Sequence, residues 1–462
     1  MDRMTGHDAS LLYMETPTHF NVGYGLMFIE PPAGSGMFSF ESFKGWLSGR
    51  CDEIATYRQH AYKPWWNFSH PVWRPDPNFD IDNHLHYLKI SGRRQAGDGE
   101  LLTLCGHLAS IPMDLTRPLW EWWYLDSLDN GTVAMFTKVH ESCIDGVQGT
   151  TLTRQTTGAI SNDSPEILIR DHGTPGTREI FVTGLLERAS RPAYLVAQIW
   201  RTAALTLRKN QKPSSDLLPR AFTAPRTHFN RTLTANRNLA YARLDLKAVK
   251  AVKNHYRTTV NTVVLYLVAS ALRNYLLCAD DLPDGPLVAY IPKAVHGAPG
   301  VEGRNQTSGF LTYLHTEVVD AEQRMSKTIA SASTSRSYFE SLGPTLISDW
   351  ARFSSPLWGK GLRLYSRLRL ADKHKVLQSL VISNIGGGLI DLDLGGARVV
   401  DLIPFASIYD GSALFVGITS VNDNLDIGLI GCPEYTPDIG YLADQLSKEL
   451  DDIAILSGRA EE

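Results

Sequence analysis

Short apolar runs, separated by Gly, Pro and other turn residues, recur in both halves of the chain. VGYGLMFIE lies in the first half, and LVAYIP, LVIS and FVGITSV lie in the second. Runs of this length between turn residues predict β-strands. Longer segments of helical spacing are mixed with them, so the pattern indicates an α/β or α+β protein with strands in each half.

Two segments have the periodicity of long helices. Residues 244–277 carry apolar side chains at helical spacing on both sides of a break near Thr258, namely Leu246, Val249, Val252, Val260, Val263, Val264 and Leu267. Residues 438–456 carry a second apolar stripe, through Leu442, Leu446, Leu450 and Ile453. We expect two consecutive helices in the first segment and an amphipathic helix near the end of the chain.

Length and composition predict a globular protein of more than one domain. The chain has 462 residues, of which 43% are hydrophobic and 20% are charged. This composition excludes a disordered or collagen-like chain, and a domain of average size has about 150 residues. The 45 Lys and Arg residues against 49 Asp and Glu residues give a net charge of −4. A nucleic-acid-binding protein is normally basic, so we expect no nucleic-acid partner.

Basic charge is concentrated in two segments. Residues 178–237 contain 11 Lys or Arg residues and three acidic residues, and residues 352–375 carry Arg363, Arg367 and Arg369 among leucines. Each segment is either a solvated surface or a contact for anionic lipid or a phosphorylated substrate. We predict an N-terminal domain over residues 1–165, a basic helical linker over 166–237 and a C-terminal domain over 238–462.

Cysteine usage indicates a cytoplasmic protein. The five cysteines are scattered, and no pair has CxxC spacing: Cys51, Cys105, Cys143, Cys278 and Cys432. This pattern suggests neither a disulfide framework nor a metal site. The N-terminus lacks the layout of a signal peptide, and no stretch approaches the ~20 uninterrupted apolar residues of a membrane span. We therefore expect a cytoplasmic protein that at most lies on the surface of a membrane or a lipid inclusion.

The segment GTVAMFTKVHESCIDGVQGTTL concentrates polar groups at the end of a strand. Val133 to Glu141 reads as a strand, and Asp145-Gly146 reads as the turn that follows it. Taken alone, a structural histidine and a turn aspartate explain this pattern better than a catalytic site does. Because side chains alternate along a strand, Glu141 and His140 point to opposite faces.

The wider layout resembles the bacterial wax ester synthase/diacylglycerol acyltransferase family. Pro118-Leu119-Trp120 precedes a strand, a turn, a second strand and the pattern H-x-x-x-x-D-G. The family signature is HHxxxDG, whose second histidine is the catalytic base. Other segments are similar to the family in the same order, namely HDASLLYMETPTHFNVGYGLMF, the helix at Asn261, Gly303-Arg304-Asn305 and LVISNIGGG.

The resemblance implies an architecture and a reaction. The fold would have two chloramphenicol-acetyltransferase-like domains, with mixed sheets flanked by helices and a channel between them. The reaction would move a long-chain fatty acyl group from acyl-CoA to diacylglycerol, giving triacylglycerol, or to a fatty alcohol, giving a wax ester. The partners are then acyl-CoA as co-substrate and a lipid alcohol, with no cofactor and no metal.

The chain departs from the family signature at the catalytic position. Alignment on Asp145-Gly146 places His140 at the first histidine and Glu141 at the second. Thr262 stands in place of an aspartate, and Gly386-Gly387-Gly388 replaces Pro-Gly-Pro. A glutamate base needs burial to raise its pKa from about 4.3. One alternative is therefore a catalytically impaired homologue that binds acyl-CoA or lipid, and another is an acyltransferase with an amine or carrier-bound acceptor.

These considerations define the candidate site. Glu141, His140 and Asp145 form the catalytic centre, in which Asp145 pairs with a distant arginine and Gly146 permits the turn. Glu141 is expected to point into the channel, and His140 to be packed or hydrogen-bonded on the other side. Cys143 reads as a small buried residue rather than a nucleophile. Ser383 and Asn384 are either oxyanion donors or turn caps. The remaining candidates for the substrate channel are Pro118, Leu119, Trp120, Asn261 and Asn305.

Overall fold

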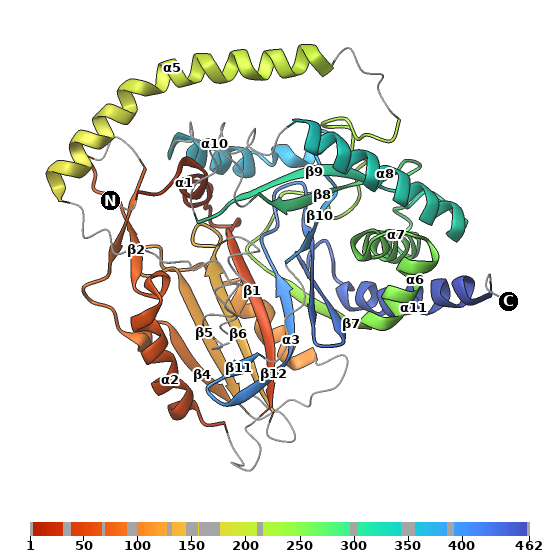
Figure 1. Cartoon of the computed structure of the whole chain (residues 1–462), viewed down its shortest axis with the longest axis horizontal. Helices are drawn as coiled ribbons and strands as arrows, with labels where there is room; N and C mark the ends of the chain where they lie inside the picture. The colour runs from red at the N-terminus through yellow and green to blue at the C-terminus, as the bar shows by residue number, and fades with distance from the viewer. Residues whose placement is uncertain are drawn as a thin grey trace.

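The fold was analysed in a computed structural model of the chain. It describes residues 3–30, 38–66, 70–89, 99–126, 132–144, 156, 176–209, 216–295, 304–342, 356–385 and 392–459. Two six-stranded sheets lie side by side, each with helices on its outer face (Figure 1). The expected mixed α/β architecture of two sheets flanked by helices is confirmed.

The first sheet has the strand order β11-β12-β1-β6-β5-β4. Its strands are β1 (Val22–Glu30), β4 (Leu85–Lys89), β5 (Trp120–Asp126), β6 (Val133–His140), β11 (Asp393–Leu394) and β12 (Ala397–Phe405). The pair β4–β5 is parallel, whereas β1 is antiparallel to both β6 and β12. Helices α2 (Phe40–Glu53) and α3 (Gly99–Ala109) bury apolar side chains such as Phe43 and Cys105 in the same core as this sheet. A separate hairpin joins β2 (Gln59–Tyr62) to β3 (Val72–Pro75).

The second sheet has the strand order β7-β14-β13-β10-β8-β9. Its strands are β7 (Asn238–Asp245), β8 (Leu287–Ala294), β9 (Thr307–Leu314), β10 (Leu380–Asn384), β13 (Leu414–Val421) and β14 (Asn424–Gly431). Strand β10 runs parallel to both of its neighbours, and the other pairs are antiparallel. The apolar runs singled out in the sequence are therefore strands β1, β8, β10 and β13.

Helices α6 (Leu246–His255), α7 (Val260–Cys278), α8 (Ala321–Leu342) and α11 (Ile439–Arg459) flank the second sheet (Figure 1). The predicted break before α7 is confirmed: Arg257 has a positive φ, and the Thr259 side chain caps α7 by accepting the Thr262 N–H. By length and composition α7 could cross a membrane, but 72% of its apolar window is buried inside the protein. It packs against α8 and α11, so it is a core helix.

The first sheet is completed by strands from the far end of the sequence. Residues of β12 pair with β1 from Tyr24–Phe405 to Glu30–Arg398. The same strand packs on β13 and β14, because Gly417 and Gly428 have no side chain to keep the Pro404 carbonyl away. We call this contact between the sheets the seam. The 238–462 segment therefore contributes strands to both sheets. The predicted domain boundaries at residues 165 and 237 stay a prediction.

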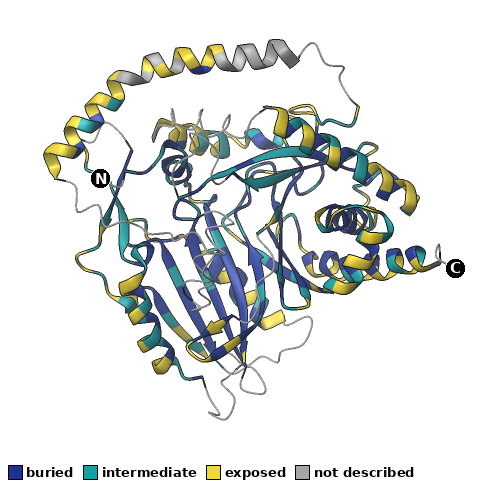
Figure 2. Cartoon of the chain, viewed as in Figure 1, coloured by how far each residue is buried: buried dark blue, intermediate teal, exposed yellow. Residues whose placement is uncertain are grey.

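Two helices with exposed apolar side chains lie outside both sheets. The long helix α5 (Thr177–Lys209) arches over one end of the molecule, and α10 (Pro356–Arg367) lies beside α1 (Gly6–Tyr13) (Figure 1). Most of the described surface of α5 is exposed (Figure 2). The exposed apolar residues are Phe181, Val182, Leu185, Leu186, Tyr194, Val196, Ile199 and Trp200 on α5, and Leu357, Trp358 and Leu364 on α10.

Candidate active site

A cavity of about 530 Å³ lies between the two sheets. The first sheet contributes β1, β6 and β12 to its wall, and the second contributes β8, β9, β10 and β13. Most of the lining side chains are apolar, and the cavity face of β1 carries Gly23 and Gly25 in place of side chains. A site of this shape suits a long apolar ligand with a small number of polar groups near its reactive end.

Glu141 is the acidic residue among the described lining residues of this cavity. It follows the last residue of β6, and its backbone N–H donates to the Asn21 carbonyl at 2.8 Å. Its Oε1 accepts hydrogen bonds from the Ser407 hydroxyl at 2.7 Å and from the Ser407 N–H at 3.3 Å. Burial raises the pKa of the Glu141 carboxyl, and the hydrogen bonds from Ser407 oppose that change.

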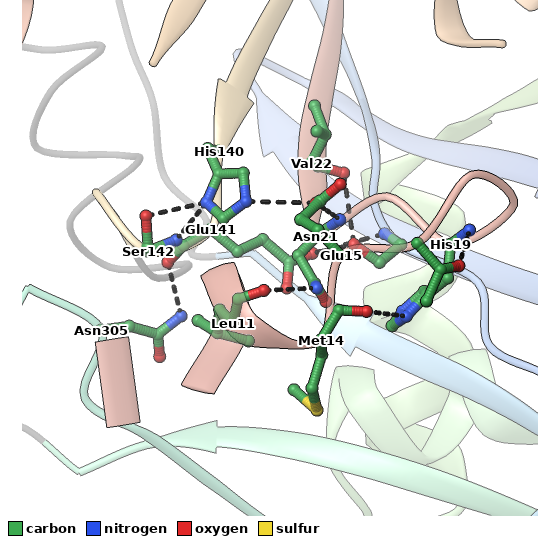
Figure 3. A network of polar contacts seen from close by, with 12 residues as sticks. Leu11, Met14, Glu15, His19, Asn21, Val22, His140, Glu141, Ser142 and Asn305 are labelled. Atoms are coloured by element: carbon green, nitrogen blue, oxygen red, sulfur yellow. Dashed lines mark hydrogen bonds and ion pairs between the residues drawn. The ribbon is translucent and has the colours of Figure 1, made fainter. Parts of the chain in front are cut away.

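His140 lies on the opposite side of the strand and is fully buried. Its Nδ1 accepts the Ser142 N–H at 3.0 Å, which places the ring proton of the neutral form on Nε2. Nε2 lies 3.2 Å from Glu15 Oε1, as Figure 3 shows. The expected geometry is therefore found: Glu141 lines the cavity with Thr137 and Val139, whereas His140 is hydrogen-bonded on the other face.

A polar framework joins α1, the end of β6 and the segment before β9. The buried Asp8 carboxylate accepts the N–H groups of Arg304 at 3.1 Å and Asn305 at 2.9 Å. The Asn305 side chain donates to the Glu141 carbonyl at 3.0 Å (Figure 3). It also donates to the Ile144 carbonyl at 3.2 Å. Burial raises the pKa of the Asp8 carboxyl to about 6, against the effect of these hydrogen bonds. The framework fixes the backbone that carries Glu141.

The other predicted site residues divide into two groups. Asn305 and Ser383 line the cavity. Pro118, Leu119, Trp120, Asn261 and Asn384 are not among its described lining residues. Leu119 and Trp120 pack in the hydrophobic core of the first sheet. The Asn384 side chain donates a hydrogen bond to Asn261 Oδ1 at 2.5 Å. Asp145, Gly146 and the glycines 386–388 lie outside the described residues, so their predicted roles stay predictions.

Cys143 is buried, and burial raises the pKa of its thiol to about 12. Its thiol therefore stays protonated at neutral pH, as expected of a small buried residue. Within the described residues, no group of three or more His, Cys, Asp or Glu side chains is placed to hold a metal ion. The expectation that the reaction needs no metal or cofactor stays a prediction.

Several cavity residues were not predicted from the sequence. His7 from α1, and Ser407 and Tyr409 after β12, line the same cavity as Glu141. Glu15 was not predicted either; its Oε1 lies 3.2 Å from His140 Nε2. His7 directly precedes the Asp8-Ala9 pair of the family-like opening, but local spacing gave no sign that it faces the site. Ser407 is 266 residues from Glu141 in the sequence.

The paired sheets and the cavity between them define a two-domain acyltransferase fold. A structure of the wax ester synthase/diacylglycerol acyltransferase from Marinobacter aquaeolei VT8 matches with a TM-score of 0.69 at 24% identity, covering 99% of this chain and 100% of that one. The first condensation domain of the calcium-dependent antibiotic synthetase matches with a TM-score of 0.55 at 14% identity, covering 98% and 96%. These likenesses show the fold.

Sequence comparison gives the family. Residues 4–264 match the wax ester synthase/diacylglycerol acyltransferase catalytic domain, and residues 304–454 match the WS/DGAT C-terminal domain. Two similar proteins of Mycobacterium tuberculosis are assigned by name to the diacylglycerol O-acyltransferases. One is 32% identical and covers 98% of this chain and 90% of its own length; the other is 29% identical and covers 98% and 99%. The chain belongs to the wax ester synthase/diacylglycerol acyltransferase family.

Proposed function

We propose that this protein is an O-acyltransferase that moves a long-chain fatty acyl group from acyl-CoA to diacylglycerol or to a fatty alcohol. Membership of the family supports the reaction class. The observation that carries the proposal is a largely apolar cavity with a half-buried carboxylate, Glu141, on its wall. A lipid chain fits such a lining, and the reaction itself needs one group to take a proton.

Glu141 is the proton acceptor of the proposed reaction. The acceptor hydroxyl gives its proton to the carboxylate while its oxygen attacks the thioester carbonyl carbon and the bond to sulfur breaks. The raised pKa of Glu141 makes the carboxylate a stronger base than an exposed one. His140 is a positioning residue, because it is held between Ser142 and Glu15 behind the strand.

The direct test is release of free CoA from palmitoyl-CoA in the presence of diacylglycerol or hexadecanol. We expect the protein to turn over, and Glu141→Ala to lose activity by at least ~100-fold, the usual size of a general-base contribution. Glu141→His serves as the family-like control. If the parent protein releases no CoA and Glu141→His does, the protein is a channel that binds acyl-CoA or lipid, and the enzymatic proposal is wrong.

We also propose that the protein works as a peripheral protein on an anionic lipid surface, through α5 and α10. Leu357 and Trp358 of α10 are exposed beside the exposed cations Lys360 and Arg367. Exposed apolar side chains among basic ones match an interfacial helix. Gly359 allows α10 to pack against the Tyr13 carbonyl of α1, whose residue Leu11 lines the cavity. The free cysteines support a cytoplasmic location.

Sedimentation with lipid vesicles tests this surface. Lys360→Gln with Arg367→Gln should weaken binding to vesicles that contain phosphatidylglycerol, with little effect on pure phosphatidylcholine vesicles. The matched control is Lys247→Gln with Lys250→Gln on α6, which removes the same charge from another exposed helix. Equal binding by both double variants would contradict the proposed role of α10.

A further inference from the structure

Two lining residues of the cavity have side chains that ordinarily titrate between pH 4 and 7. They are Glu141 and His7, among the described residues around the cavity. The other titratable lining residues are tyrosines, and burial raises their pKa values: that of Tyr290 rises to about 12, and those of Tyr24, Tyr57 and Tyr409 rise as well. The described lining of the cavity therefore holds one carboxylate and one imidazole, two side-chain types that serve as general bases and acids in enzymes.

His7 reaches the cavity from the first turn of α1. Leu11, one helical turn further on, lines the same cavity, so His7 and Leu11 share one face of the helix. The His7 side chain is half-buried, and its Nδ1 is shielded from solvent. The helix is fixed at this point, because Thr5 caps it through the Asp8 N–H and the Asp8 carboxylate is bound by two further N–H groups.

Asn305 connects the two elements that carry His7 and Glu141. Asn305 donates its backbone N–H to Asp8, the neighbour of His7, and its side chain to the Glu141 carbonyl. This bridge fixes α1 against the end of β6. The charged or titratable groups on the elements packed here are Asp8, Glu15, His140 and Arg304.

We propose that His7 is the general acid of the acyl transfer, acting with Glu141 as the base, and this role rests on the proposed function. Glu141 takes the proton of the acceptor hydroxyl, and the oxygen forms a bond to the thioester carbonyl carbon. The bond between that carbon and sulfur breaks, and the His7 imidazolium gives its proton to the departing sulfur. The proton on Glu141 then returns to His7, so the cycle neither consumes nor releases a proton.

A thiol has an ordinary pKa of about 8.5, so an unprotonated thiolate is the less stable form at neutral pH. Protonation of the departing sulfur therefore favours completion of the transfer at neutral pH. An acid beside the sulfur therefore matters most for a thioester with an ordinary thiol. It matters little for a thioester whose thiol is strongly acidic.

The experiment compares two acyl donors with the full-length protein. Palmitoyl-CoA has an ordinary thiol, whereas the palmitoyl thioester of thionitrobenzoate has a much more acidic one. We expect His7→Gln to lower kcat on the order of 100-fold with palmitoyl-CoA. With the aryl thioester the same variant should stay close to the parent protein. Glu141→Gln should be impaired with both donors, because both reactions need the base.

The pH profile separates an acid from a structural role. The parent protein should give a bell-shaped dependence of kcat/KM on pH. His7→Gln should lose the alkaline limb, and Glu141→Gln should lose the acid limb. His107→Gln, at an exposed histidine of α3, is the control and should keep both limbs.

The role of His7 is overturned if His7→Gln is impaired equally with the two donors. It is also overturned if His7→Gln keeps full activity with palmitoyl-CoA. His7→Asn repeats the test if the glutamine variant does not fold, as judged by thermal unfolding. A parent protein that is inactive with both donors overturns the proposed function and, with it, the role of His7. An active parent with an unaffected His7 variant overturns the role of His7 alone.

Discussion

Carboxylates lie between the two sheets at two places, and their surroundings differ. At the seam, Asp401 of β12 and Asp426 of β14 are fully buried, and Arg243 of β7 forms ion pairs with both. In the cavity, Glu141 has Ser407 as its hydrogen-bond donor and open space beside it. A buried charge with a cation holds strands together, whereas a half-buried charge facing a cavity is available to a substrate.

The largest change in stability is expected at the seam. Arg243→Met leaves two buried carboxylates without their cation, and breaking a buried pair in this way costs about 3 kcal/mol. We expect the free energy of unfolding in urea to fall by that amount, while CoA release per folded molecule is retained. Lys247→Met, which removes an exposed cation, should stay within about 0.5 kcal/mol of the parent. A stable Arg243→Met protein would show that the seam does not depend on this cluster.

The second prediction concerns the pH dependence of the seam. Burial, with Asp401 nearby, raises the pKa of Asp426 to about 7. The folded state then binds a proton that the unfolded state releases near pH 4, so this contribution to stability is lost as the pH rises from about 4 to 7. The difference in unfolding free energy between the parent and Asp426→Asn should fall by about 3 kcal/mol across that window.

The same measurement contains its own control for other groups. Asp8 and Glu141 also have raised pKa values, and they contribute equally to the parent and to Asp426→Asn. Their effects cancel in the difference. If the difference in unfolding free energy between the parent and Asp426→Asn does not change with pH, the assignment of the bound proton to Asp426 is wrong.

The third prediction concerns Ser407 in the cavity. Its hydroxyl donates to the Glu141 carboxylate at 2.7 Å and so favours the charged form. In Ser407→Ala the pKa of Glu141 should rise further, and the acid limb of kcat/KM should move up by about one pH unit. Activity on the acid limb should therefore fall, with little change at high pH. Ser341→Ala, at an exposed serine of α8, should leave the limb in place.

The smallest effect is expected at Gly23, on the cavity face of β1. A Cβ atom at this position meets the Val139 carbonyl no closer than 3.7 Å, so a larger side chain fits and projects into the cavity. We expect Gly23→Leu to lower kcat/KM for palmitoyl-CoA relative to octanoyl-CoA by about 10-fold, because methylene groups lose their space. An unchanged ratio would place the acyl chain elsewhere.

The sequence predicted the elements better than their assembly. The periodicity located strands β1, β6, β8, β10 and β13, and the helices α6, α7 and α11, because it is local information. The pairing of β12 with β1 is not local, because Tyr24 pairs with Phe405, 381 residues further along the sequence. No local pattern distinguishes a strand that stays in its own half from one that crosses to the other sheet.

The site shows the same division. Alternation along β6 placed Glu141 and His140 on opposite faces, and the structure agrees. His7, Ser407 and Tyr409 reach the cavity from elements distant in sequence, so the sequence alone did not identify them. Leu119 and Trp120 were proposed for the channel because of the family-like motif, but they pack in the core of the first sheet.

The central claim is that the cavity carboxylate acts in the chemistry rather than in the stability of the fold. The most direct measurement is the rate of CoA release from palmitoyl-CoA by Glu141→Gln, which keeps the shape of the side chain and removes its charge. We predict a loss of at least ~100-fold in kcat, with a free energy of unfolding within about 1 kcal/mol of the parent. A variant that keeps the parent rate, or that loses activity only because it unfolds, would contradict the claim.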